Sequence, residues 1–139
     1  MTGKANPLSG RPRSWWLWTA YWGALFVLMH VPLPDRTLEH VHLSDSVLHF
    51  MVYFILTGLG AYHLWRTSGG AFTVTVMRWA LIYTGYAACD EWLQQFVHRT
   101  PSVDDWLADL GGIAVATGIA MVFGRRFPTR LSESHSAGA

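Results

Sequence analysis

The chain has 139 residues, of which 51% are hydrophobic and only 14% are charged. Soluble domains carry about 25% charged residues, and eight Trp in so short a chain is typical of proteins that meet a membrane interface. The net charge of +1 argues against a nucleic-acid-binding protein, which would carry a strongly basic surface. The single cysteine, Cys89, excludes an intramolecular disulfide framework. The composition therefore indicates a small polytopic membrane protein whose first partner is the lipid bilayer.

Four apolar stretches follow one another along the chain, and we expect each to form a membrane-spanning helix. They cover roughly residues 14–31, 46–65, 71–97 and 103–123. A helix rises 1.5 Å per residue, so about 20 apolar residues cross the hydrocarbon core. The sequence thus predicts an all-α, four-helix transmembrane bundle over residues 14–124, with a basic tail at 1–13 and a polar tail at 125–139. Small residues in the fourth stretch favour close helix contact, namely Gly111, Gly112, Ala116 and Gly118.

The first apolar stretch has a competing interpretation as a cleaved secretory signal, because basic residues precede it. No small residues of a cleavage site follow the stretch; Pro32 and Pro34 end it instead. Tryptophans at its start are typical of an aromatic belt at a membrane interface. We therefore expect an uncleaved span.

Basic and acidic residues separate onto opposite sides of the predicted bundle. The two tails and the loop after the second stretch share one side and hold most of the basic residues, namely Lys4, Arg11, Arg13, Arg66, Arg78, Arg125, Arg126 and Arg130. Arg36 and Arg99 fall on the other side, together with every acidic residue except Glu133. The positive-inside rule then predicts an N-in/C-in, multi-pass protein of the cytoplasmic (inner) membrane.

One polar stretch, residues 88–112, covers the end of the third apolar segment, the loop after it and the start of the fourth segment. It contains Asp90, Glu91, Gln94, His98, Arg99, Asp104, Asp105 and Asp109. An ionisable side chain costs roughly 2.5–3.5 kcal/mol at the centre of a membrane helix and less near its ends. A plain helix-capping loop would need one or two such residues, so this concentration favours a functional site on the side away from the cytoplasm.

Helical spacing places polar groups on one face of each of the last three predicted helices. On the second predicted helix the face consists of Asp45, His49, Val52, Leu56 and Gly60, with Tyr53 at its edge. On the third helix it consists of Thr84, Ala88, Glu91, Gln95 and His98, and on the fourth of Asp105, Asp109, Gly112 and Ala116. Asp104 lies off its stripe and is expected to cap the helix. Asp90 points roughly 100° from Glu91, so only one of the pair needs to face the interior. Since bundles build sites from facing helices, we expect His49, Glu91 and Asp109 to share a cavity.

The polar residues resemble the pattern of the VanZ-like family of small bacterial membrane proteins. The pattern is Asp45-x3-His49-x3-Tyr53, Glu91-x2-Gln94, Arg99 and Asp105-x3-Asp109-x2-Gly112, within residues 44–118. The resemblance implies four membrane spans. The resemblance also implies a link to low-level resistance to the glycopeptide teicoplanin, because the family is named for a protein with that link. It does not imply a particular biochemical activity.

The chain departs from the family pattern at two positions. Asp109 stands where many members have Asn, and His98 stands where many have Gly before the arginine. The loop before Arg99 is also one residue shorter, which leaves two candidates for the family glutamine. The i+3 spacing from Glu91 favours Gln94, whereas helical phase favours Gln95.

Three functions fit these residues. A membrane-embedded enzyme on a lipid-linked or cell-wall intermediate would use His49 as general acid or base, oriented by Asp45 or Asp105. Glu91 would be its second carboxylate and Arg99 would hold a phosphate or carboxylate. A binding protein, or an accessory subunit of a larger membrane complex, would use the cluster to hold an envelope component or as a buried network. A third possibility is a divalent-cation site of His49 and the carboxylates.

No nucleophile elbow, zinc-protease motif or phosphatase signature selects the enzyme. We therefore favour the binding or accessory function, in which the cluster holds or supports the handling of an envelope lipid or cell-wall precursor. The sequence predicts no cofactor beyond the divalent cation.

The predicted orientation can be tested by cysteine labelling in intact cells. In a Cys89→Ala background, a cysteine at Ser102 should react with a membrane-impermeant reagent added outside, and a cysteine at Ser134 should not. The physical reason is the concentration of basic residues on one side. The reverse labelling pattern would overturn both the orientation and the outward-facing site.

Overall fold

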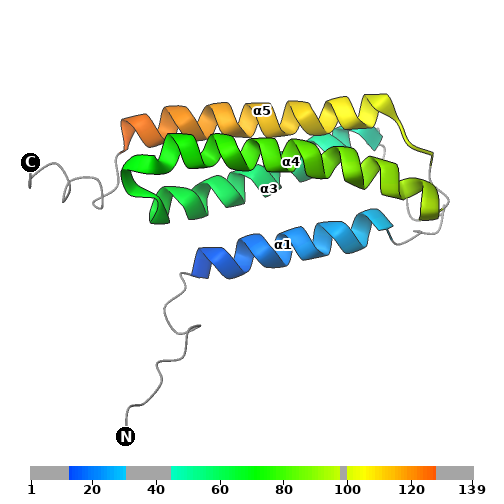
Figure 1. The fold of residues 1–139 in the computed structure, drawn as a ribbon, viewed down its shortest axis with the longest axis horizontal. Helices are drawn as coiled ribbons and strands as arrows, with labels where there is room; N and C mark the ends of the chain where they lie inside the picture. Colours follow the sequence, from blue (N-terminus) through cyan, green and yellow to red (C-terminus); the bar gives the residue numbers. More distant parts are fainter. Residues whose placement is uncertain (1–12, 31–44, 98–99, 128–139) are drawn as a thin grey trace, which may run out of the picture.

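The computed structural model describes residues 13–30, 45–97 and 100–127, and in these ranges the chain forms four long α-helices and no strand. The helices are α1 (Arg13–His30), α3 (Asp45–Thr67), α4 (Phe72–Gln94) and α5 (Val103–Arg126). Short 3-10 helices, η1 (Gly69–Ala71) and η2 (Gln95–Val97), flank α4 (Figure 1). The predicted all-α, four-helix fold is confirmed. Residues 1–12 and 128–139, which make up most of the predicted tails, lie outside the described ranges.

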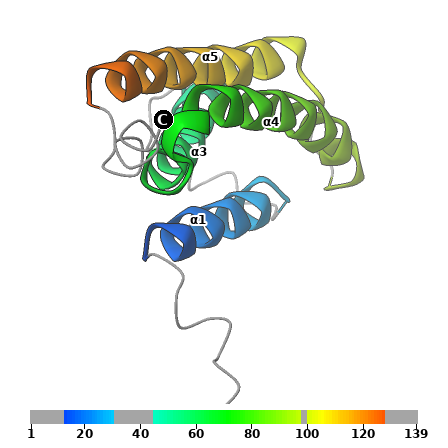
Figure 2. The same ribbon diagram turned by 60° about the vertical axis from the view of Figure 1, so that its left-hand side comes forward.

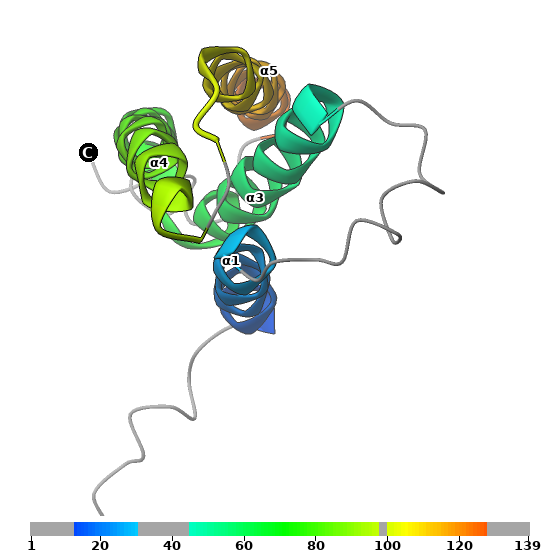
Figure 3. The same ribbon diagram turned by 90° about the vertical axis from the view of Figure 1, so that its right-hand side faces the viewer.

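Successive helices run in alternating directions along one long axis (Figure 1). The most extensive contact joins α3 to α5, while α1 packs against α3 and α4. Figures 2 and 3 show α1 on the opposite side of α3 and α4 from α5. The alternation gathers the ends of α1 and α4 and the starts of α3 and α5 at one end of the bundle, which we call the polar end.

An aromatic core joins α1 to α3 and α4. Trp18, Tyr53 and Tyr83 are buried in it, and the ring of Trp22 packs edge-on against Tyr83 and Tyr86 at 5.5 and 5.4 Å between centroids. Such aromatic pairs contribute about 0.5–1.5 kcal/mol each beyond the area that they bury. The first helix is therefore held mainly by ring packing.

Large apolar side chains also cover the outside of the helices. Exposed examples come from every helix, namely Leu17, Val27, Ile55, Leu81, Ile119 and Val122. Water disfavours such a surface, whereas lipid tails accept it. By length and mean hydropathy, α3 and α5 are able to cross a membrane. Crossing by α1 and α4 stays a prediction.

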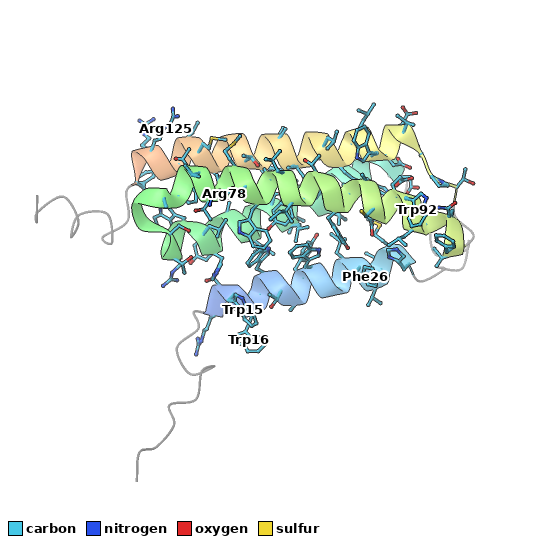
Figure 4. The ribbon with its side chains drawn as sticks, in the orientation of Figure 1. Trp15, Trp16, Phe26, Arg78, Trp92 and Arg125 are labelled. Atoms are coloured by element: carbon cyan, nitrogen blue, oxygen red, sulfur yellow. The ribbon has the colours of Figure 1, made fainter. Side chains whose placement is uncertain are left out.

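The charged residues of the described ranges separate along the bundle. Arg13, Arg66, Arg125 and Arg126 lie at the helix termini away from the polar end. In Figure 4, Arg78 and Arg125 lie toward the end of the bundle opposite the polar end, whereas Trp92 lies toward the polar end. The described acidic residues belong to the starts of α3 and α5 and the end of α4. This separation is what the predicted orientation requires.

Gly112 allows the close contact between α3 and α5. A Cβ atom on Gly112 would fall against the carbonyl oxygen of Phe50 and the amide nitrogen of Phe54, both of the α3 backbone. Ala116, one turn further on, is also buried. Gly118 is different, because it is exposed and a Cβ there would meet nothing within 4 Å. Close helix contact thus involves Gly112, and the expectation for Gly118 was wrong because that residue faces away from α3.

We predict that Gly112→Ala destabilises the protein by about 1–3 kcal/mol, the usual cost of forcing extra atoms into a packed interior. Gly118→Ala is the matched control, since it adds the same methyl group to the same helix in open space. The measurement is thermal unfolding of both purified variants in detergent. Equal midpoints for the two variants would show that α3 and α5 do not approach as described.

Candidate functional site

The polar end encloses a group of ionisable side chains inside the bundle. Asp90, Glu91, Asp105 and Asp109 are buried there with His49, and we call these five residues the carboxylate cluster. His49, Asp90 and Asp109 are each only 1% exposed. The ion pairs that these carboxylates make within the described ranges are with His30 and His49. The cluster thus carries more potential negative charge than the described part of the chain neutralises.

His49 and Asp109 join α3 to α5 at the centre of the cluster. The Nδ1 atom of His49 lies 3.1 Å from Oδ1 of Asp109. A carboxylate accepts hydrogen bonds, so the imidazole donates from Nδ1, and in a neutral ring Nε2 is then an acceptor. The Nε2 atom and the Oδ2 atom of Asp109 are buried and have no hydrogen-bond partner in the described ranges. Both atoms can therefore bind a ligand.

Glu91 ties the end of α4 to the start of α5. One carboxylate oxygen accepts a hydrogen bond from Nε2 of Gln94 at 3.2 Å, and the other accepts from the backbone N–H of Ser102. Ser102 caps α5, since its side chain accepts a hydrogen bond from the backbone N–H of Asp105. A carboxylate at a helix N-terminus is favoured by the helix dipole. Glu91 is thereby held in place from two sides.

Asp105 makes a second connection between α3 and α5. Its Oδ1 atom accepts a hydrogen bond from the hydroxyl of Ser46 at 2.7 Å. Asp45 is exposed at the rim, and ligand atoms of Asp45, His49 and Asp105 lie within 4.8 Å of one another. Asp104 is exposed and outside the cluster, as its position off the polar stripe predicted.

Asp90 extends the cluster toward α1. Its carboxylate lies 3.7 Å from Nδ1 of His30, yet neither oxygen has a hydrogen-bond partner among the described residues. Tyr53 is fully buried and its hydroxyl is close enough to interact electrostatically with Asp90 and Asp109. The spacing of Tyr83, Ala87, Asp90 and Gln94 at i, i+4, i+7 and i+11 is the signal that would have identified this residue.

The buried face of α4 differs from the predicted one. Tyr83, Ala87, Asp90, Glu91 and Gln94 are buried, whereas Ala88 and Gln95 are exposed. Regular α-helix ends at Gln94, and the side chain of Gln95 donates to the carbonyl oxygen of Trp92 at 2.7 Å. Gln95 therefore does not join the cluster, and Gln94 is the glutamine that contacts Glu91.

The structure brings most of the predicted site residues together at the polar end. These are His49, Tyr53, Glu91, Gln94, Asp105 and Asp109, with Asp45 at the rim and Gly112 one turn along from Asp109. Tyr53 lies at the centre of the buried face of α3 rather than at its edge. His98 and Arg99 lie outside the described ranges, so the role of Arg99 in holding a phosphate or carboxylate stays a prediction.

Comparison with known proteins identifies a family. A family model described as VanZ/LLP1 matches residues 13–124, which cover α1, α3, α4, all but the last two residues of α5 and every described residue of the site. No curated protein and no solved structure matches the chain. The match confirms the resemblance that the polar residues indicated.

We predict that Gln94→Ala destabilises the protein by about 1.5–3 kcal/mol, the range for hydrogen bonds to charged groups. The variant removes the side-chain donor to the buried Glu91 carboxylate. Gln95→Ala is the matched control and should leave stability within about 0.5 kcal/mol of the wild type, because its side chain is exposed. Thermal unfolding in detergent measures both effects. A larger loss for Gln95→Ala would place the other glutamine in the cluster.

Proposed function

The chain belongs to the VanZ/LLP1 family, and we propose that it is a multi-pass protein of the cytoplasmic membrane that binds the polar group of an envelope component. The binding site is the carboxylate cluster at the polar end of the bundle. The described ranges support the assignment as a membrane protein, because α3 and α5 are long and apolar enough to cross a membrane. The proposal extends this to four spans and to a ligand.

The observation that carries the proposal is a set of buried polar atoms at the polar end that have no hydrogen-bond partner in the described ranges. They include Nε2 of His49, the hydroxyl of Tyr53, both oxygens of Asp90 and Oδ2 of Asp109. Buried polar atoms are paired in roughly 90% or more of cases, and an unpaired one costs about 1–3 kcal/mol. Five such atoms in one place indicate a site that is completed by a bound group.

The position of the site supports an envelope component as its ligand. The positive-inside rule predicts that the polar end faces away from the cytoplasm. Lipid-linked and cell-wall intermediates present polar groups at that side of the membrane, next to a lipid anchor. The exposed apolar surface of the helices would admit the anchor at the same time.

The His49–Asp109 pair supports catalysis as a second candidate function. A carboxylate that orients an imidazole through Nδ1 leaves Nε2 free to move a proton, which is the arrangement of a general acid or base. An enzyme acting on the same envelope component would use this nitrogen. A third candidate is a structural accessory subunit, in which the cluster only joins the helices.

A susceptibility assay tests the binding proposal in cells. A susceptible bacterium that produces the chain should show reduced susceptibility to teicoplanin, and His49→Ala and Glu91→Gln should abolish that change. Asp104→Asn is the control, because it removes an exposed carboxylate from the same end and should keep the phenotype. Membrane levels are measured by immunoblotting. Loss of both site variants from the membrane would replace the binding function by the structural one.

Binding and catalysis separate in a second measurement. Purified protein in detergent is incubated with a labelled lipid-linked cell-wall intermediate, and bound and converted material are separated by chromatography. Retention without conversion supports binding, and conversion that His49→Ala abolishes supports the enzyme. No retention and no conversion would contradict both.

A further inference from the structure

We infer that the carboxylate cluster binds a divalent transition-metal ion, with one ligand atom each from His49, Glu91 and Asp109. These three residues are buried, and their potential ligand atoms all lie within 4.8 Å of one another. Cations in proteins hold nitrogen and oxygen ligands at roughly 2.0–2.5 Å, which separates neighbouring ligands by about 3–4 Å. The arrangement therefore needs only a small contraction around an ion.

The charge balance of the site favours a cation. Asp90, Glu91 and Asp109 are buried beside one another and interact electrostatically. Within the described ranges, the residues that could offset this charge by ion pairing are His30 and His49. Buried charges in proteins are paired or coordinate metals. A divalent ion would offset two carboxylates at once and would leave His49 neutral, as a metal ligand requires.

Asp90 is an independent indication, because it is not one of the three ligands. Its side chain is 1% exposed, and neither oxygen has a hydrogen-bond partner in the described part of the chain. It interacts electrostatically with His49, Glu91 and Asp109, so its charge acts on the same group. An outer carboxylate of this kind is what metal sites use to orient water or a ligand at the ion.

The neighbouring group of Asp45, His49 and Asp105 is a weaker site for the same ion. Asp45 is exposed, whereas all three residues of the inner group are buried. In the described part of the chain, Oδ2 of Asp109 also has no hydrogen-bond partner. His49 belongs to both groups, so an ion takes the inner, more enclosed position.

The donor set determines which ions fit. One imidazole with two carboxylates suits manganese or zinc better than magnesium or calcium, which prefer oxygen ligands alone. Three protein ligands leave coordination positions open. A polar group of the envelope component could occupy them, and this last step alone rests on the proposed function.

The test is direct binding of Mn²⁺ to the purified full-length protein in detergent, after treatment with a chelator. The free Mn²⁺ signal in electron paramagnetic resonance should fall to a stoichiometry of one ion per chain. His49→Gln and Asp109→Asn, which are close in size to the native residues, should bind at least about 10-fold more weakly. Asp104→Asn is the matched control and should bind like the wild type, because Asp104 is exposed and outside the cluster.

A measurement on the wild type keeps the inference falsifiable if the variants do not fold. Pulsed electron paramagnetic resonance of bound Mn²⁺ should show nitrogen coupling from the imidazole ligand. No Mn²⁺ binding, binding without nitrogen coupling, or wild-type affinity in well-folded His49→Gln would each overturn the site. The assay contains no envelope component, so its outcome is independent of teicoplanin susceptibility and of lipid retention.

Discussion

The close approach of α3 and α5 is the constraint on which the polar end depends. Gly112 lets the α5 backbone lie against the backbone of Phe50 in α3. His49 directly precedes Phe50, and Asp109 is one turn before Gly112, so the same contact places the imidazole and the carboxylate 3.1 Å apart. A larger residue at Gly112 would separate the helices where the two groups meet. A packing requirement and a site requirement thus coincide in one glycine.

The start of α5 explains how so much negative charge stays inside the bundle. The first backbone N–H groups of a helix have no partner within the helix and carry partial positive charge. Glu91 from α4 accepts one of them, at Ser102, and Asp105 lies in the first turn of α5. Ser46 of α3 supplies a hydroxyl to Asp105. Helix ends therefore offset part of the charge, and the more deeply placed Asp90 and Asp109 retain oxygens that have no hydrogen-bond partner among the described residues.

Hydropathy and helical period predicted the fold and much of the site, because both are local properties of the sequence. The stripe of Asp105, Asp109 and Gly112 was predictable, since α5 has one main buried face directed at α3 and α4. The error on α4 has a tertiary cause. Sequence reasoning gave that helix one interior face and chose between Asp90 and Glu91. Both are buried because α4 has neighbours on two sides, and sequence spacing alone does not reveal a second neighbour.

The two neighbours of α4 also divide the site between two kinds of packing. Glu91 faces α5 and makes well-defined hydrogen bonds that connect the two helices. Asp90 faces α1, where the 3.7 Å approach of His30 is its closest ionic contact in the described ranges. Most of the α1 contact is aromatic instead, through Trp18 and Trp22. Ring packing fixes the position of α1 without supplying hydrogen bonds to Asp90, so α1 encloses the cluster but leaves the Asp90 carboxylate without a hydrogen-bond partner in the described ranges.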